Sequence, residues 1–464
     1  MNYTDAAFPG FFAVTFVAYY LARRAEVQIL VLVAASLCFY AWQALGPLAI
    51  FLVSWLVTGL ASHAVIVWPD RRRATAAAGV VANLALLGFF KYKFLFIHAA
   101  APWGTQTSLW TLLLAAPLPI GISFYTFHGI SLLVDVSRGR DTQTFAAGGG
   151  LQPHLARTLL YLAFFPQLIA GPIVKARDFF PQVGLKRLQH IDVAGSCQNL
   201  VLGLFLKMVV ADNLGEQTLW ISYPYFLGKS SVDLLVLLYG YSAQIFADFA
   251  GYSLVAIGLA KLLGYRLPQN FDFPYSACSI ADFWRRWHIS LSSWLRDYLY
   301  IPLGGSRNGG IRTYTNLVLV MLLGGLWHGA AWSFAIWGLW HGIGLAVERR
   351  IAGGFRSAKG SAPMRVLRMV LVFHFVTIGW LFFKLQEAPQ VLLYLNSLLR
   401  SEVRGISWEA ALVGIYGSAV VLYHFAHAWR GRLSEWTKNV IYGLMLFLVI
   451  LNPGPKVPFI YFQF

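Results

Sequence analysis

Long apolar stretches separated by short polar segments recur along this chain of 464 residues. A helix that spans a membrane needs about 20 predominantly apolar residues, and many of the stretches approach or exceed that length. The pattern therefore predicts an all-α, polytopic membrane protein with about ten to twelve hydrophobic helices, some of them incomplete. The stretches cover residues 8–22, 27–44, 47–68, 75–98, 108–136, 155–174, 198–214, 232–263, 313–347, 365–385, 408–428 and 438–452.

Two regions depart from this simple pattern. The stretch at 313–347 has 35 residues, so we expect either a span with a re-entrant piece or two short helices. Residues 266–312 are more polar, and FWRRWHISLSSWLRDYLY within them is read as one amphipathic helix at the membrane interface. One face of that helix would carry Trp284, His288, Leu291 and Leu295, and another would carry Arg285, Ser292 and Arg296.

Composition supports the membrane assignment and a single membrane domain over residues 1–464. The chain is 58% hydrophobic and 12% charged, which is about half the charged share of an average soluble domain. Its net charge of +17 would suggest nucleic acid in a soluble protein, but the basic residues lie between apolar stretches and accompany no nucleic-acid motif. We therefore expect them to set orientation in the bilayer and to meet anionic lipid, with no nucleic-acid partner.

The basic clusters also predict an orientation. Arg23-Arg24, Arg71–Arg73 and Arg138 with Arg140 follow the first, third and fifth stretches, whereas the intervening loops lack Lys and Arg. Because basic loops stay in the cytoplasm, the N-terminus is predicted to be non-cytoplasmic and the loops at 70–74 and 138–157 cytoplasmic. The basic pair follows the first apolar run, an order opposite to that of a cleavable signal peptide.

Ionisable side chains within apolar stretches are costly, and so they are candidates for function. His328, in MLLGGLWHGAAW, is the foremost, because an imidazole in apolar surroundings stays neutral and can act as a base. The alternative is a buried histidine bonded to a neighbouring helix. His288 is the second candidate, although taken alone it is better explained as an interfacial histidine among tryptophans. His341 follows His328 by thirteen residues, so one straight helix cannot present both on one face.

The remaining candidates are weaker. Asp248 is a buried carboxylate that either orients a His or Arg or pairs structurally, and Asp135 and Asp212 lie near stretch ends, where carboxylates are tolerated. His424 and His427 are three apart but lack a third ligand, so no metal site is predicted. His128 and His374 are read as structural. Cys38, Cys197 and Cys278 are scattered, and no GxSxG, HExxH or Walker motif occurs.

Several segments together resemble the membrane-bound O-acyltransferases, specifically the bacterial branch typified by the alginate O-acetylation membrane protein. The resemblance covers nearly the whole chain and is most specific at WHISLSSWLRDYLYIPLGG and GGLWHG. The matching segments are PIGISFYTFHGISLLVDVSRG (119–139), FFPQLIAGPIV (164–174), GLFLKMVVADNL (203–214), YSAQIFADFAGYSLVAIGLA (241–260), LPQNFDFPY (267–275), FWRRWHISLSSWLRDYLYIPLGG (283–305), GGLWHGAAW (324–332) and PFIYFQF (458–464).

The resemblance implies a helical fold with a funnel through the membrane and acyl transfer to a hydroxyl. It implies that His328, of the WHG motif, is the central catalytic residue and that His288, of WHISLS, is its companion. The predicted substrate-binding or supporting residues are Asp248, Trp287, Trp327, Arg285 and Arg296. Acetyl-CoA is the expected acyl donor, with no bound cofactor and no metal.

The leading hypothesis is an inner-membrane O-acetyltransferase for an exported or surface polysaccharide, working with a periplasmic or membrane-anchored acetyltransferase partner. One alternative is D-alanyl transfer to teichoic acid by a sister branch. A second is a transporter with an intramembrane histidine proton relay, although no paired broken helices are evident in the sequence. An inactive scaffold for a surface-polymer complex is a third, and retention of both histidines argues against it.

Overall fold

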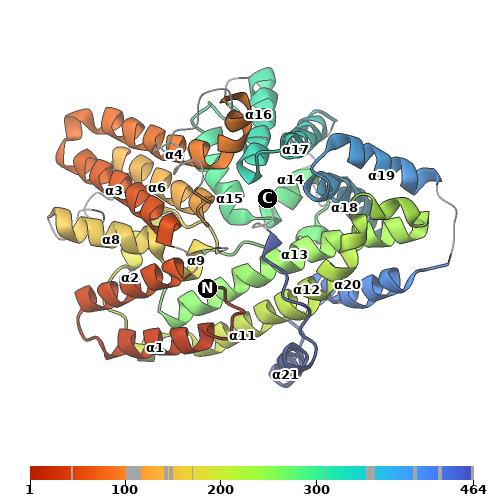
Figure 1. The fold of residues 1–464 in the computed structure, drawn as a ribbon, viewed down its shortest axis with the longest axis horizontal. Helices are drawn as coiled ribbons and strands as arrows, with labels where there is room; N and C mark the ends of the chain where they lie inside the picture. Colours follow the sequence, from red (N-terminus) through yellow and green to blue (C-terminus); the bar gives the residue numbers. More distant parts are fainter. Residues whose placement is uncertain are drawn as a thin grey trace. The chain divides into compact units, whose positions relative to one another are not determined.

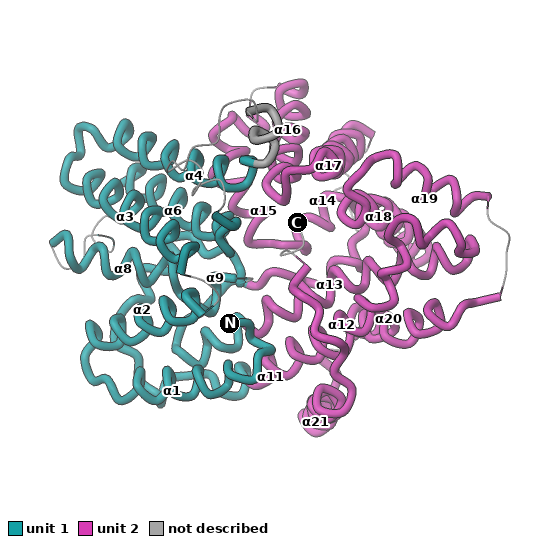
Figure 2. Tube along the Cα trace, viewed as in Figure 1, with its two compact units in different colours: residues 1–196, 256–268 teal, residues 197–255, 269–464 magenta. Residues whose placement is uncertain are grey.

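The computed structural model describes residues 1–42, 45–100, 116–139, 145, 150–169, 171–307, 309–351, 361–400, 405–426 and 431–460. Over these ranges the chain forms helices and connecting segments without a strand, which confirms the all-α prediction (Figure 1). Residues 108–115 of one predicted span, and His427, lie outside the described ranges. The chain divides into two compact units, residues 1–196 with 256–268 and residues 197–255 with 269–464 (Figure 2).

The first unit is a bundle of helices in which α6 is the most deeply buried. The helix α3 packs against α4, α6 and α8, and α4 also packs against α6. Almost every residue of α6 is buried as a result, including polar ones such as His128 and Asp135. The helices of this unit are α1 (Phe8–Leu21), α2 (Ala25–Ala41), α3 (Leu45–Val67), α4 (Arg72–Ala100), α6 (Ile122–Ser137), α8 (Leu151–Ala163), α9 (Phe165–Leu168) and α10 (Ala176–Phe179).

The predicted span at 155–174 is wrong as a continuous helix. The helix α8 ends at Ala163, because Phe164 has an extended ψ of 103°, and the four-residue α9 follows. Thirteen residues of helix measure about 20 Å, which is short of the ~30 Å hydrocarbon core of a bilayer. The apolar residues of this stretch are instead buried inside the first unit.

The second unit contains the long helix α13 and a tight pair formed by α16 and α17. The helix α13 is buried along most of its length and continues at its C-terminal end into the first unit. The helices of the second unit include α12 (Asp212–Gln217), α13 (Ser231–Leu262), α14 (Ile280–Arg286), α15 (Ile289–Leu295), α16 (Gly310–His328), α17 (Trp332–Ile351), α18 (Ala362–Lys384), α19 (Ala388–Arg400), α20 (Trp408–Ala426) and α21 (Glu435–Leu451). The helix α11 (Val193–Leu204) is followed by a π-helical segment, η4 (Phe205–Ala211), which belongs to the second unit.

Six helical segments within the described ranges are long and apolar enough to cross a membrane, which confirms a multi-pass membrane protein. They are Leu45–Val67, Pro69–Lys93, Val193–Ile221, Ser231–Leu262, Ala362–Lys384 and Trp408–Ala426. On α18, Val366, Leu367, Val370 and Leu371 are exposed along one side, a surface that lipid would cover. Of the two alternatives for residues 313–347, the pair of short helices is confirmed by α16 and α17.

Candidate active site

His328 is the last residue of α16, at the point where the chain turns back into α17. The two helices lie side by side (Figure 1) because glycines at their interface let the backbones touch. A Cβ on Gly325 would overlap the backbone oxygen of Phe334, and a Cβ on Gly338 would overlap that of Met321. The WHG segment is thus the tip of a closely packed helical hairpin, and His328 within it is only 7% exposed.

Aromatic rings surround the imidazole of His328. The Trp327 ring lies 4.9 Å away between centroids and the Phe383 ring, near the end of α18, lies 5.0 Å away. Trp337, one turn into α17, meets it edge to face at 5.2 Å. These contacts come from three helices, so the position of the imidazole is fixed by packing, as general-base catalysis requires.

A cavity of about 230 Å³ lies beside His328 within the second unit. One water molecule occupies about 30 Å³ in the liquid, so the cavity has room for a group of several heavy atoms. Its wall is mainly apolar, with Ser292 and Arg296 as polar members near the imidazole. The lining residues are Trp284, Leu291, Ser292, Leu295, Arg296, Tyr300, Leu317, Val320, Met321, Gly324, His328, Trp337 and Leu345.

His288 lies where the predicted amphipathic helix breaks, so the prediction of one continuous helix is wrong. The helix α14 ends at Arg286, and α15 begins at Ile289 after His288 takes a left-handed conformation with φ 44° and ψ 53°. This conformation is costly for a residue with a Cβ and is often found at functional sites. A π-helical turn, η8 (Arg296–Tyr300), then carries Arg296.

Asn270 stabilises the unusual backbone at His288. Its carbonyl oxygen accepts a hydrogen bond from the Ile289 amide at 2.9 Å, and its side-chain Oδ1 accepts one from the Ser290 hydroxyl at 2.7 Å. The same Oδ1 lies 3.3 Å from Nδ1 of His288, whose ring packs edge to face on Phe249 at 4.6 Å. Burial lowers the pKa of His288 to about 3, because an apolar environment disfavours the imidazolium.

Trp327 contacts both candidate histidines. Its ring centroid lies 4.9 Å from that of His328 and 6.4 Å from that of His288. The structure therefore brings together His328, His288 and Trp327, and it adds Arg296 through the shared cavity wall.

Two other predicted site residues lie away from this cavity. Trp287 is buried against Phe271, Phe283 and Trp380, at centroid distances of 5.0, 5.5 and 4.9 Å, and it does not line the cavity. The side chain of Arg285 is 69% exposed and pairs with Asp282 at 3.3 Å.

Asp248 belongs to a buried ion-pair cluster elsewhere in the second unit. Its Oδ1 lies 2.8 Å from the ammonium of Lys207, which also lies 2.6 Å from Asp212. The C-terminal segment joins the cluster, since the Ile460 amide donates to Asp248 at 2.7 Å and Lys207 donates to the Val457 carbonyl at 2.9 Å. Of the two roles predicted for Asp248, the geometry is that of structural pairing.

Lys207 was missed by the sequence reasoning, which noted only the two carboxylates. Residues five apart, such as Lys207 and Asp212, do not face each other on an α-helix. The π-helical segment η4 has wider turns, and it brings the two side chains into contact. The available signal was a lysine and an aspartate five apart in an apolar run.

His341, His128, His374 and His424 take part in packing or local hydrogen bonds. His341, fully buried on α17, contacts Trp337 at 4.9 Å and Trp284 at 5.2 Å but does not line the cavity. His128 accepts a hydrogen bond from the Val174 amide, and His374 lies 2.6 Å from the Tyr239 hydroxyl. His424 is bonded to the Val420 carbonyl, and among the described residues no cluster of potential metal ligands is present.

The fold and this site define a multi-pass helical membrane protein with a buried histidine at the wall of a small cavity. A family model described as "MBOAT, membrane-bound O-acyltransferase family" matches residues 107–386, more than half of the chain. The chain belongs to the membrane-bound O-acyltransferase family, and it is therefore an acyltransferase by family. The matched region includes α14 to α17, which form the candidate site.

The names of several relatives agree with this assignment. The chain is 38% identical to the probable alginate O-acetylase AlgI of Azotobacter vinelandii over 83% of its own length and 76% of that protein. It is 33% identical to the protein of the same name from Pseudomonas putida over 96% of both chains. A peptidoglycan O-acetyltransferase of Helicobacter pylori is 36% identical over 71% of this chain and 65% of the relative. A teichoic acid D-alanyltransferase of Bacillus subtilis is 28% identical over 57% of this chain and 68% of the relative.

Proposed function

We propose that this protein is an inner-membrane O-acetyltransferase that supplies acetyl groups for an exported or surface polysaccharide, with acetyl-CoA as the donor. The observation that carries the proposal is the buried imidazole of His328 at the wall of a cavity of about 230 Å³. That volume suits an acetyl thioester terminus rather than a sugar polymer. The relatives named for O-acetylation are more similar, over more of the chain, than the relative named for D-alanyl transfer, which supports acetyl as the group transferred.

The chemistry requires a base and positioning, since a thioester has a good leaving group. In the proposed step His328 takes the proton of the acceptor hydroxyl while the hydroxyl oxygen bonds to the acetyl carbonyl carbon. The carbon–sulfur bond breaks, and the departing thiolate receives the proton from His328. Arg296 lines the same cavity and pairs with Asp297 at 2.8 Å, and we assign it the role of stabilising negative charge that develops at the carbonyl oxygen. His288 supports the site through Trp327.

The test is transfer of radiolabelled acetyl from acetyl-CoA to the polysaccharide in lipid nanodiscs, with the wild-type and variant chains each combined with the acetyltransferase partner. His328→Ala is expected to lower transfer by about 10²–10⁴-fold, the usual contribution of a general base. His341→Ala, which removes a neighbouring buried imidazole outside the cavity, is the control and should keep most activity per folded molecule. Retention of more than about a tenth of activity by His328→Ala would exclude the base role.

A periplasmic or membrane-anchored acetyltransferase partner with its own serine nucleophile is part of the proposal. A cavity of about 230 Å³ fits a small acyl group better than a polymer chain, which supports a relay in which the acetyl group meets the polysaccharide outside the cavity. The protein alone should therefore acetylate polymer poorly, and addition of the partner should restore polymer acetylation. Efficient acetylation of polymer by the isolated protein would rule out the relay while leaving direct acetyl transfer intact.

A further inference from the structure

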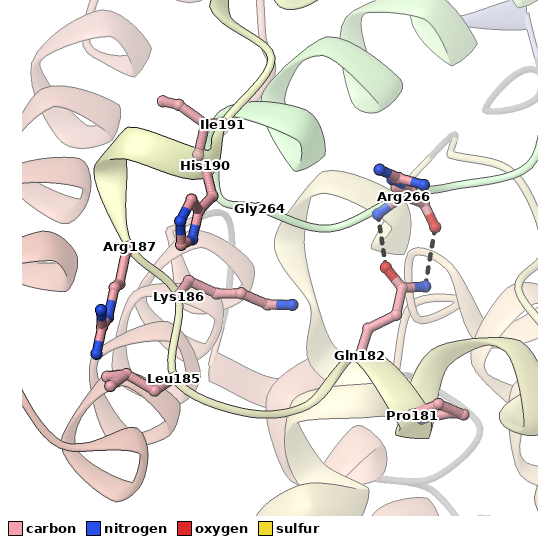
Figure 3. Close-up of a pocket in the computed structure, with 9 residues that line it drawn as sticks. All are labelled: Pro181, Gln182, Leu185, Lys186, Arg187, His190, Ile191, Gly264 and Arg266. Atoms are coloured by element: carbon pink, nitrogen blue, oxygen red, sulfur yellow. Dashed lines mark hydrogen bonds between the residues drawn. The ribbon is translucent and has the colours of Figure 1, made fainter.

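A second cavity, of about 520 Å³, lies wholly within the first unit, far along the sequence from His328. It is framed by the segment at 181–191 and by the segment that follows α13 (Figure 3). Its lining is basic, with Lys186, Arg187, His190 and Arg266 among its nine residues. The remaining lining residues are Pro181, Gln182, Leu185, Ile191 and Gly264.

Two glutamines hold the backbone at two of these basic residues by hydrogen bonds. Gln28, from α2, accepts from the Lys186 amide at 2.8 Å and donates to the Lys186 carbonyl at 2.9 Å. Gln182 does the same for Arg266, at 2.7 and 3.1 Å, as the dashed lines in Figure 3 show. Each glutamine side chain both accepts from and donates to the backbone of a residue far away in sequence. The arrangement is therefore preorganised rather than a chance gathering of surface charge.

The side chain of Lys186 is also guided into the cavity. Gly264 has φ +76°, and a Cβ there would lie 3.1 Å from Cδ of Lys186, so a glycine leaves room for the lysine stem. The ammonium lies 5.0 Å from the centre of the Tyr265 ring. In Figure 3 the side chains of Lys186 and His190 point into the framed space, whereas Arg187 points away from it.

Electrostatics at this site favour an anion. Burial and the positive charge of Arg266 lower the pKa of Lys186, which indicates like charges held near each other. The carboxylate of Asp192 accepts a hydrogen bond from the Gly195 amide at 2.9 Å and pairs with the ammonium of Lys261 at 3.3 Å. Its pKa is held below the usual range, mainly by the Gly195 hydrogen bond, so it remains ionised beside Lys261.

The same charges place the site at the cytoplasmic face of the membrane. The segments 175–192 and 261–266 flank two consecutive spans, Val193–Ile221 and Ser231–Leu262, so they lie on one side. Together they contain six Lys or Arg and two Asp, whereas the loop at 222–230 contains one Lys. Because Lys and Arg are concentrated in cytoplasmic loops, the cavity faces the cytoplasm. The break in α8 agrees, since residues 151–175 then need not cross the bilayer.

We propose that this cavity is a binding site for a phosphate or pyrophosphate group, with Lys186 and Arg266 as its main cationic ligands. The chemistry fits two sources at a cytoplasmic membrane surface, namely a soluble phosphate-bearing molecule and the headgroup of an anionic lipid. Ammonium and guanidinium groups from two clamped segments would converge on the phosphate oxygens, and His190 would donate a further hydrogen bond.

Binding to purified full-length protein tests the proposal with two sets of probes. Calorimetry in neutral detergent with inorganic pyrophosphate and adenosine 3′,5′-bisphosphate addresses the soluble source. The lipid source is tested with protein reconstituted in phosphatidylcholine bilayers that contain a small fraction of fluorescent phosphatidylglycerol. Energy transfer from the protein to the fluorescent lipid measures binding. In whichever set binds, Lys186→Gln and Arg266→Gln are each expected to weaken affinity about tenfold, the loss of one charge-assisted hydrogen bond.

Matched variants separate this site from general electrostatics. Arg71→Gln removes the same charge from an exposed residue of the first unit that does not line the cavity, and should weaken affinity by less than about threefold. Gly264→Ala keeps every charge but displaces the Lys186 stem, and should weaken affinity as Lys186→Gln does. Arg266 is exposed, so its variant should fold normally, as checked by gel filtration.

Each outcome decides the proposal. Loss of pyrophosphate binding in the variants assigns a soluble phosphate ligand, and loss of lipid binding alone assigns a headgroup. Equal effects of Lys186→Gln and Arg71→Gln, or no binding in either set, would overturn it. Because the readout is binding, failure here is distinguishable from failure of the acetyl-transfer proposal.

Discussion

The indole of Trp337 meets the imidazole of His328 edge to face, with ring planes at 90° and centroids 5.2 Å apart. The contact joins the end of α16 to the first turns of α17, and it forms part of the cavity wall. An edge-to-face aromatic contact contributes about 0.5–1.5 kcal/mol beyond area burial and fixes ring orientation. Trp337 is thus one of three aromatic neighbours that set the direction in which the imidazole points, and among them it also lines the cavity.

The first prediction is that Trp337→Phe lowers the rate of acetyl transfer while the protein still folds. A phenyl ring preserves the apolar wall but withdraws the edge that meets His328, so kcat/KM should fall about tenfold, as misplacement of a catalytic group does. The matched control is Trp380→Phe, another buried tryptophan that packs on Trp337 at 6.0 Å without lining the cavity. Equal rates for the two variants would mean that Trp337 has no positioning role.

The second prediction separates the backbone at His288 from its imidazole. A left-handed conformation costs a residue with a Cβ about 1–2 kcal/mol, and glycine does not incur that cost. His288→Gly should therefore unfold at a higher temperature than His288→Ala, although both lose the ring contact with Phe249. Intrinsic fluorescence during heating in detergent gives the comparison.

Transfer activity should be low in both of these variants, because neither supports Trp327 beside His328. Full activity in His288→Gly would show that the imidazole is dispensable and that only the chain reversal matters. Identical melting of the glycine and alanine variants would contradict the strain assigned to this position.

The sequence predicted the membrane class, the helix locations and the pairing of His328 with His288 through motif resemblance, because apolar length and specific motifs are local signals. The interruptions were harder to predict. The break at His288 depends on hydrogen bonds that Asn270, eighteen residues earlier, accepts, and the contact between Lys207 and Asp212 depends on a π-helical turn. Neither has a periodicity to detect, since both arise from tertiary contacts that override local helix preference.

The third prediction concerns the glycines of the α16–α17 hairpin. Gly325→Ala and Gly338→Ala each place a methyl group against a backbone oxygen of the facing helix, which has no flexible end to move aside. Overpacking of this kind costs about 1–3 kcal/mol. We expect lower melting temperatures and weaker acetyl transfer, because the hairpin carries His328 at its tip.

Gly414→Ala is the control for the hairpin variants. Gly414 lies on α20 with no atom within 4 Å of the position of a Cβ, so the same substitution adds no clash. Its melting temperature should equal or exceed that of the wild type, since alanine favours a helix over glycine by about 1 kcal/mol. A hairpin variant as stable as Gly414→Ala would show that the two helices can separate without loss.

The fourth prediction concerns the buried cluster of Lys207, Asp212 and Asp248. Lys207→Met leaves two buried carboxylates without their shared cation, and breaking a buried pair in this way costs about 3–5 kcal/mol. Asp248→Asn should be milder, because Lys207 keeps Asp212 and the new amide oxygen can still accept from the Ile460 amide. Thermal unfolding in detergent should rank the wild type above Asp248→Asn, and Asp248→Asn above Lys207→Met.

Combining the substitutions distinguishes an unpaired charge from lost packing. The triple variant Lys207→Met, Asp212→Asn, Asp248→Asn has no buried charge left in the cluster, so it should melt above the Lys207→Met single variant. Lys438→Met serves as the surface control, because its partner Glu435 is 77% exposed and such pairs contribute at most about 1 kcal/mol. If the triple variant were the least stable of the set, steric fit rather than charge pairing would hold the C-terminal segment against η4.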